Sequence, residues 1–433
     1  MVGRGTEFDV DAYGIRSLAG DATGALVRRL GAFERMYHRR QQTSTMHFCV
    51  VAELADDLNP GALARALRAV QHRHPLLNVY VEDDPQAGLG FRRPTTVPPI
   101  PVTVVDETGY TWCDLVAEEL TRPFDTAIAP MVRVVLLRSA PAAIILTVDH
   151  TIVDGISAAH ILRDLFSALN GHQLQVLPVP PSQEELFGRL RDAQPAAALA
   201  ATSSPPPAQP DWFATPSTIR PFDRAVPHLS AISFDEDLTR RLVTRARAER
   251  TTVHSALVSA MSRAILESGR NEYVRMLTPC AFRPQIGVHD DVCLYFTAAR
   301  TAFTRDQLTN LWDMARTVGD QLAGARSVPA LLGGSAATEQ FIPIDATPED
   351  AQAFMIRGLS FEAFASNLRV LDMGPPEAVR PVAIWGPAIL AQVQGELACG
   401  VCTFNGQLRI VSASHDPLVA YLARVRDILD AAC

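Results

Sequence analysis

Apolar positions in the first part of the chain alternate between strand-like and helix-like spacing. Residues 46–54 (MHFCVVAEL) form a mostly apolar run that predicts a strand. Residues 60–73 then place apolar side chains three and four positions apart, which predicts an amphipathic helix. Asn59 is the expected cap of this helix, and Pro60 suits its first position. The pattern is a strand followed by a helix.

Strands followed by a helix are predicted again further along the chain. Two apolar runs, 131–138 and 143–148, are separated by a short turn and predict adjacent strands. The second run is apolar throughout, which is typical of a strand buried on both faces. A helix-like stripe follows over residues 158–169, with Ser157 as its expected cap. The stretch LTVDHTIVDGIS (146–157) therefore joins a buried strand to an amphipathic helix.

A proline-rich segment separates the two halves of the chain. Ten of the 31 prolines lie between Pro178 and Pro221, which predicts an extended linker with one short helix that begins after Ser182. Beyond it, strand and helix patterns resume, and Asn405-Gly406 marks a tight hairpin. We therefore predict an α/β fold with a first half over residues 1–175, a linker over 176–222 and a second half over 223–433.

Charge and composition exclude several classes of protein. The net charge is −8, which argues against nucleic acid as the main partner because a phosphate backbone calls for a basic face. All 39 basic residues are arginines. The absence of lysine excludes Schiff-base chemistry and a phosphate-binding loop of the lysine type.

The sequence contains no pattern typical of a targeting signal or of a metal site. The first residues are acidic and lack the apolar core of a signal peptide, and no run of about 18 apolar residues predicts a membrane span. The seven cysteines are scattered, which suits a reducing compartment. Cys399 and Cys402 lie three apart on a predicted strand, so their side chains should point to opposite faces. We expect a cytoplasmic monomer without a metal site.

His150 is the residue of LTVDHTIVDGIS with the clearest chemical use. A neutral imidazole is available as a base near pH 7, and it suits proton removal from an alcohol or amine that attacks an activated carbonyl. Two roles stay open for Asp154: it orients the imidazole, or it pairs with an arginine and stiffens the turn. Gly155 is expected to supply a backbone conformation that other residues avoid. An ordinary turn that contains a histidine is the alternative.

Three motifs in this order resemble the condensation domains of nonribosomal peptide synthetases and the polyketide-associated acyltransferases. They are RHPLL (73–77), RPFDTAIAPMVRVVLLR (122–138) and DHTIVDGIS (149–157). The free-standing phthiocerol dimycocerosyl transferase type is similar in length. Matches in the second half are weaker on their own and consist of TTVHSALVSAMSRAI (251–265), PCAFRPQ (279–285) and CGVCTFNGQLRIV (399–411).

The resemblance implies two chloramphenicol-acetyltransferase-like halves in a V, with a central tunnel. It implies no bound cofactor; the donor would be a thioester on coenzyme A or on the 4′-phosphopantetheine of an acyl carrier protein, and the acceptor a small alcohol or amine. His150 matches the catalytic histidine of the family, Asp154 its structural aspartate, and Arg283 the arginine expected to pair with that aspartate. Many members carry a second histidine where this chain has Asp149, and Asn78 stands where condensation domains often have arginine.

An acyltransferase of secondary metabolism or lipid assembly, with His150 as general base, is therefore the leading hypothesis. Two alternatives stay open: a condensation-like cyclase or tailoring enzyme that acts on a carrier-bound chain, and a non-catalytic module that binds a carrier or an acyl chain. Tyr295 and Trp385 are candidates for the tunnel wall, although core packing is the default interpretation of each. Backbone N–H groups near Gly155 are candidates for an oxyanion stabiliser.

Overall fold

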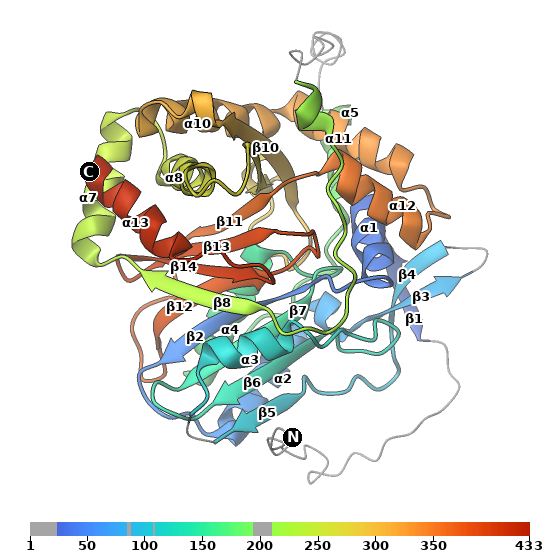
Figure 1. Cartoon of the computed structure of the whole chain (residues 1–433). Helices are drawn as coiled ribbons and strands as arrows, with labels where there is room; N and C mark the ends of the chain where they lie inside the picture. Colours follow the sequence, from blue (N-terminus) through green and yellow to red (C-terminus); the bar gives the residue numbers. More distant parts are fainter. Residues whose placement is uncertain (1–23, 85–87, 107–108, 194–209) are drawn as a thin grey trace.

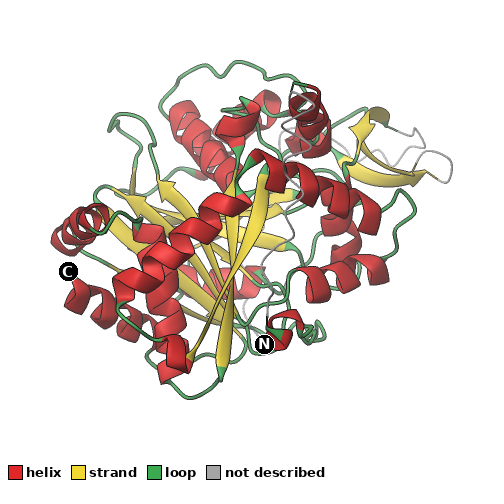
Figure 2. Ribbon diagram, turned by 90° about the horizontal axis from the view of Figure 1, so that it is seen from above, coloured by secondary structure: helices red, strands yellow, loops and turns green. Residues whose placement is uncertain are grey.

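The computed structural model describes residues 24–84, 88–106, 109–193 and 210–433, which fold into two α/β halves (Figure 1). In Figure 1 the first half lies at the bottom and the second half at the top. Helices surround the strands in the view from above (Figure 2). None of the described helices is long and apolar enough to cross a membrane.

The first half is built on a five-stranded sheet with the order β12-β2-β7-β6-β5. Its strands are β2 (His47–Leu54), β5 (Val102–Val105), β6 (Val132–Leu137), β7 (Ala143–Asp149) and β12 (Pro381–Ile389), and its helices include α2 (Pro60–Arg73), α3 (Trp112–Glu119) and α4 (Gly155–Leu169). The adjacent strands expected from the two apolar runs are β6 and β7, which pair antiparallel. Every residue of β7 is buried, as its continuous apolar sequence predicts.

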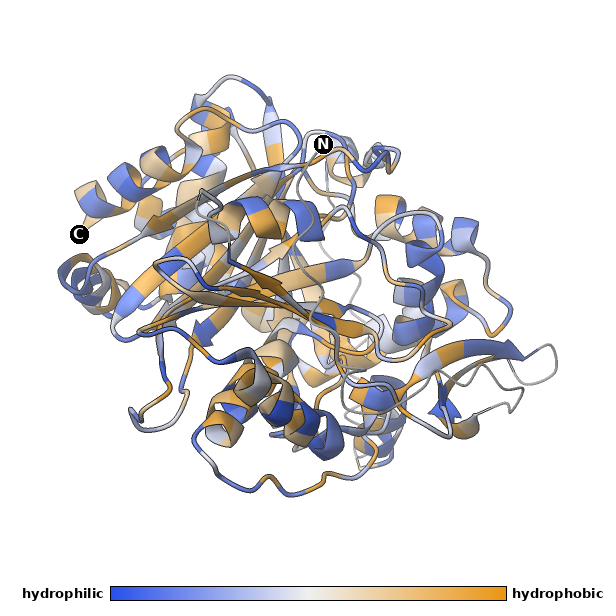
Figure 3. Ribbon diagram, turned by 90° about the horizontal axis from the view of Figure 1, so that it is seen from below, coloured by the Kyte–Doolittle hydropathy of each residue, from blue (hydrophilic) through white to orange (hydrophobic). Residues whose placement is uncertain are grey.

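The second half contains a six-stranded sheet with the order β10-β9-β11-β13-β14-β8. Its strands are β8 (His228–Ser233), β9 (Tyr273–Ala281), β10 (Phe296–Thr304), β11 (Ala363–Val370), β13 (Leu397–Phe404) and β14 (Gln407–Ser414). Its main helices are α7 (Glu236–Ala248), α8 (Val253–Glu267), α10 (Leu311–Ala325) and α13 (Tyr421–Ala432). Figure 3 shows the contrast that drives this packing: the strands are mostly apolar, and the helices carry hydrophilic segments among apolar ones.

Smaller elements lie beside the two sheets. A three-stranded sheet joins β1 (Ala25–Arg29), β4 (Gly88–Arg93) and β3 (Tyr80–Asp84). Further helices are α1 (Ala32–Gln41), α5 (Gln183–Asp192), α9 (Arg283–Ile286), α11 (Val328–Phe341) and α12 (Pro348–Ala353). Helix α5 is the short helix expected in the proline-rich segment, and Ser182 caps it. Part of that predicted linker, residues 194–209, lies outside the described residues.

Strand β12 links the two halves. It belongs by sequence to the predicted second half, yet it pairs antiparallel with β2 in the sheet of the first half. It also packs against β13 and β14 of the other sheet. Gly400 of β13 permits this approach, since a Cβ there would lie 2.0 Å from the Pro387 carbonyl oxygen of β12. The two sheets thus share a core between them. The residue boundaries of the two predicted halves remain a prediction.

Two local predictions on β13 and β14 are confirmed. Phe404 pairs with Gln407, and Asn405 and Gly406 both have positive φ, of 49° and 72°, as a two-residue hairpin turn requires. Cys399 and Cys402 are free and buried in two different core clusters, on opposite faces of β13. No group of three or more potential metal ligands occurs in the part of the chain that the structure describes.

Candidate active site

The stretch 146–157 forms the turn between β7 and α4, as its sequence predicts. Strand β7 ends at Asp149, His150 follows at once, and α4 begins at Gly155. The cap of α4 is Asp154, whose Oδ1 accepts a hydrogen bond from the Ser157 N–H at 2.7 Å. The expectation that Ser157 caps the helix is therefore wrong. Asp154, three residues earlier in the chain, is the cap.

Asp154 is held by an arginine from the second half of the chain. The Arg283 Nη2 donates to both carboxylate oxygens, at 3.0 and 3.1 Å, and the Tyr295 N–H donates to Oδ2 at 2.9 Å. Burial alone would raise the pKa of Asp154, but the Arg283 charge and the N–H donors of Ser157 and Tyr295 hold this pKa below its usual range. The pair implied by the family resemblance is thus present, and it fastens the motif to the second half.

Ser157 adds a second set of contacts to the same junction. Its hydroxyl donates to the Cys293 carbonyl oxygen at 2.7 Å and accepts from the Arg283 Nη2 and the Cys293 N–H. All three residues are buried. Because a buried polar group without a partner is costly, this network favours a single position for the start of α4.

Gly155 is needed for space and not for an unusual backbone conformation. Its φ is not among the positive values, so the expected reason for a glycine is wrong. A Cβ at this position would lie 2.7 Å from Cδ2 of Leu368, a buried side chain on β11. The glycine lets the first turn of α4 approach the sheet of the second half.

Gly155→Ala should therefore lower the free energy of unfolding by about 1 kcal/mol, the low end of the usual cost of overpacking, because the clashing atom is the end of a side chain that lines the cavity. Alanine is a better helix former than glycine, so propensity alone would act in the opposite direction. Urea denaturation of Gly155→Ala, Leu368→Ala and the double variant measures the clash. We expect the double variant to be more stable than the sum of the single changes indicates. A Gly155→Ala protein as stable as the wild type would contradict the clash.

The His150 ring lies in an aromatic and apolar setting. Its centroid is 4.3 Å from that of Tyr37, 5.0 Å from Phe48 and 5.5 Å from Phe296, with the Phe296 ring stacked on it. Only 8% of the residue is exposed. Burial lowers the pKa of His150 to about 4, against the opposing effect of the Asp154 carboxylate. The imidazole is therefore neutral near pH 7.

Asp149, the position at which the sequence departs from the condensation-domain motif that it resembles, stabilises the turn between β7 and α4. Its carboxylate accepts hydrogen bonds from the Thr151 N–H, at 2.8 Å, and from the Gln41 side-chain amide of α1. It is fully buried, and burial raises the pKa of Asp149 to about 6 despite these donors. An acceptor at this position thus ties the turn to α1.

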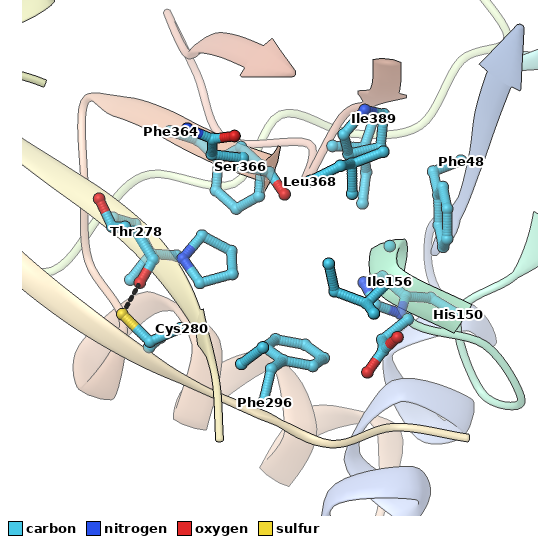
Figure 4. A pocket seen from close by; sticks show the side chains of 18 of the residues that line it. Phe48, His150, Ile156, Thr278, Cys280, Phe296, Phe364, Ser366, Leu368 and Ile389 are labelled. Atoms are coloured by element: carbon cyan, nitrogen blue, oxygen red, sulfur yellow. Dashed lines mark hydrogen bonds between the residues drawn. The ribbon is translucent and has the colours of Figure 1, made fainter. Parts of the chain in front are cut away.

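A cavity of about 370 Å³ adjoins His150 and is bounded by both halves. Figure 4 shows His150, Phe48 and Ile156 on one side of it and Thr278 and Cys280 on the opposite side. The wall around His150 is mainly apolar and includes Phe33, Tyr37, Met46, Phe48, Phe296 and Ile389. Mostly apolar walls with a few polar groups are typical of small-molecule sites.

Neither aromatic residue expected on the tunnel wall lines this cavity. Tyr295 is fully buried, and its hydroxyl donates to the Pro181 carbonyl oxygen at 2.7 Å. Trp385 of β12 packs on Trp112 and donates to Glu53 at 2.8 Å. Both residues take the core-packing role that was their default interpretation, because their polar atoms find partners inside the protein.

Sequence reasoning missed a group of polar residues at the cavity. His254, for which a surface or packing role is the default, lies on the cavity wall near the start of α8, and its Nδ1 is 3.3 Å from the Asn367 side-chain amide. Arg326 and Arg369 are also on the wall. No local pattern indicated these residues, since α8, α10 and β11 meet only in the folded chain.

Sequence comparison relates part of the chain to a nonribosomal peptide synthetase. No family model matches the chain. The nonribosomal peptide synthetase kk1B of Curvularia clavata is 30% identical over 142 residues, 31% of this chain, and the matched part is 1% of that much longer protein.

Several solved structures resemble nearly the whole chain at low sequence identity. Polyketide synthase associated protein 5 of Mycobacterium tuberculosis has a TM-score of 0.64 at 15% identity, with 95% of this chain and 98% of that chain covered. The first condensation domain of the CDA synthetase has a TM-score of 0.65 at 14% identity, with 94% and 96% covered. The TRI3 trichothecene 15-O-acetyltransferase of Fusarium sporotrichioides has a TM-score of 0.65 at 13% identity, with 93% and 95% covered. The chain therefore has the fold of condensation domains and polyketide-associated acyltransferases, as its motifs indicate.

Proposed function

We propose that the protein is an acyltransferase that moves an acyl group from a thioester to a hydroxyl or amine acceptor. The donor carries coenzyme A or the 4′-phosphopantetheine of a carrier protein. The observation that carries this proposal is the position of His150, a neutral base on the wall of an apolar cavity between the two halves. The fold shared with condensation domains and with an acetyltransferase supports the same class of reaction.

The proposed reaction follows from general base catalysis. The His150 imidazole removes the proton from the acceptor as its oxygen or nitrogen attacks the thioester carbonyl carbon. The tetrahedral intermediate then collapses, the C–S bond breaks, and the imidazolium returns the proton to the departing thiolate. One C–O or C–N bond forms, one C–S bond breaks, and no covalent enzyme intermediate is needed.

The first turn of α4 is the candidate oxyanion stabiliser. Gly155 and Ile156 lie on the cavity wall beside His150. The N–H groups of the first turn of a helix lack intrahelical partners and carry the positive end of the helix dipole. Donors of this kind stabilise negative charge on a tetrahedral intermediate.

A direct assay tests the proposed function. The protein is incubated with short- and long-chain acyl-coenzyme A or acyl-pantetheine thioesters and a panel of alcohols and amines, and products are identified by mass spectrometry. Stoichiometric thiol release with an ester or amide product supports acyl transfer. Loss of water without thiol release would support the cyclase or tailoring alternative. Binding of donor without turnover by any acceptor would support the non-catalytic module.

The pH dependence of the reaction reports on His150 directly. The base is active when neutral, and burial lowers the pKa of His150 to about 4. We therefore expect kcat/KM for an alcohol acceptor to stay level as the pH falls from 8 to 5 and to decline only near pH 4, tenfold per unit below the pKa. Circular dichroism at each pH, and recovery of activity on return to pH 7, control for unfolding. A decline centred near the ordinary value of 6.5 would contradict a desolvated base.

A further inference from the structure

The charges on the cavity wall do not balance. Besides His150, the wall includes one carboxylate, Asp154, one further histidine, His254, and two arginines, Arg326 and Arg369. Asp154 is neutralised by Arg283 at 3.0 Å. Within the described ranges, no carboxylate lies within ion-pair distance of Arg326 or Arg369. The wall therefore carries two positive charges that the described protein does not neutralise.

The two arginines lie on the same cavity wall as His254. Arg326 caps the C-terminus of α10, and its Nε donates to the Leu322 carbonyl oxygen at 3.2 Å, whereas its two Nη groups have no protein partner among the described residues. Arg369 is exposed near the end of β11, with its backbone at a positive φ of 68°. Both guanidinium charges, after the larger effect of burial, contribute to lowering the pKa of His254. Contacts also link Arg369 to this imidazole: its backbone N–H donates to the Asn367 Oδ1 at 2.7 Å, and the Asn367 side-chain nitrogen lies 3.3 Å from the His254 Nδ1.

Other groups on this wall also favour an anion. Thr252, on the cavity wall, caps the N-terminus of the 15-residue helix α8 through its side chain. That helix end presents the positive end of its dipole. The two arginines lack a protein counter-charge within the described ranges although the protein as a whole carries a net charge of −8. In the ligand-free protein, two like charges placed together repel each other. An anion bound between them makes the same arrangement favourable.

The same cavity wall also offers polar groups to a chain-like ligand. Thr278 is 1% exposed, and its hydroxyl has no hydrogen-bond partner among the described residues. Ser366 and Asn367 lie on the same wall. A buried hydroxyl without a partner is costly unless a ligand or water satisfies it. The Ser366 and Asn367 side chains are suitable partners for the amides of a pantetheine chain.

We propose that Arg326 and Arg369 bind the phosphate that a pantetheine thioester carries, so that the cavity admits the phosphorylated arm and His150 meets its thioester. The proposal rests on the proposed acyl transfer and adds to it the recognition of one group, the phosphate at the distal end of the arm. Arginine suits this task because its planar fork donates two parallel hydrogen bonds to phosphate oxygens. Coenzyme A and a carrier protein supply the same 4′-phosphate chemistry.

Three donors with the same acyl group separate phosphate recognition from the other contacts. They are acyl-coenzyme A, acyl-4′-phosphopantetheine and acyl-pantetheine, of which only the last lacks the phosphate. Loss of a charge-assisted hydrogen bond predicts that Arg326→Gln and Arg369→Gln each raise KM about 10- to 100-fold for the two phosphorylated donors. With acyl-pantetheine, we expect KM to stay within twofold of the wild-type value. Arg68→Gln, an exposed arginine of α2 away from the cavity wall, is the matched control.

The outcomes distinguish this proposal from the proposed function. Equal effects of the arginine substitutions on all three donors, or none on any, would overturn phosphate recognition while acyl transfer stands. An effect confined to acyl-coenzyme A would assign the arginines to its nucleotide portion instead, which also overturns the proposal. If no donor is turned over, acyl transfer fails, and calorimetry with a thioether analogue of acyl-4′-phosphopantetheine, compared with its dephosphorylated form, still tests the arginines. Equal affinities for these two analogues would overturn the proposal.

Discussion

His150→Ala should lower kcat by about 10²–10⁴, the usual contribution of a positioned general base. The substitution removes the only imidazole that the turn after β7 presents to the cavity. Binding of the donor should change much less, because the cavity wall consists mainly of other residues. The measurement is steady-state kinetics with the donor and acceptor pair that the product screen identifies.

A second histidine variant, His160→Ala, is the control for this result. His160→Ala removes a histidine of α4, the helix that follows the His150 turn, at a side chain that does not line the cavity, so its kcat should stay close to that of the wild type. His150→Ala also removes a ring that packs on Tyr37, Phe48 and Phe296, so melting temperatures of both variants must accompany the rates. Equal product formation by folded His150→Ala and wild-type protein would exclude the assignment of His150 as the base.

Asp154→Asn should lower the free energy of unfolding by about 3–5 kcal/mol, the typical cost of breaking a buried ion pair. The neutral amide would leave the Arg283 guanidinium buried without its counter-charge, with 7% of that side chain exposed. One amide oxygen can still cap α4, so the loss reflects mainly the charge. Denaturation in urea at pH 7 measures the difference.

The pH dependence of this loss identifies its origin. The pKa of Asp154 is held below its usual value of 3.8 by Arg283 and by the N–H donors, against the effect of burial. A carboxylate whose pKa is lowered on folding stabilises the folded protein above its unfolded pKa, and this contribution disappears as the pH falls through the folded pKa. The stability difference between wild type and Asp154→Asn should therefore shrink as the pH falls below about 3.8.

A double-variant cycle with Arg283→Gln completes the test. If Asp154 and Arg283 act as a pair, the double variant should lose less stability than the two single variants together. An unchanged unfolding free energy combined with lost turnover would instead indicate that Asp154 orients the His150 ring. Additive losses would contradict a direct interaction between the two side chains.

Much of the local structure followed from the sequence. The cap at Asn59, the helix after Ser182 and the hairpin at Asn405-Gly406 are signals that act over a few residues, and all three occur as predicted. The separation of Cys399 and Cys402 followed from the two-residue period of a strand. Residues 296–395 gave no such assignment, and they contain β10, β11, β12 and three helices.

The residues of the candidate site were likewise predicted only in part. The motif predicted that His150 follows a buried strand and precedes a helix, and the family resemblance led to Arg283 as the partner of Asp154. The reason for Gly155 was misjudged because the limiting contact, Leu368, lies more than 200 positions along the chain. Tyr295 and Trp385 pack in the core, as their default interpretation has it, and not on the cavity wall for which they were candidates. Residue type alone does not reveal whether an aromatic ring faces a cavity or a core.

The sequence by itself determined the elements with clear capping, periodicity or turn signals and the turn that contains His150, because such signals depend on neighbours within about one helical turn or strand. Tertiary structure decided what that turn faces. Strand β12 crosses to the first sheet, Gly155 meets β11, and α8, α10 and β11 bring His254, Arg326 and Arg369 to the cavity of His150. These contacts join residues that are distant in the chain, and they arise from packing two sheets together, which no local pattern of residues encodes.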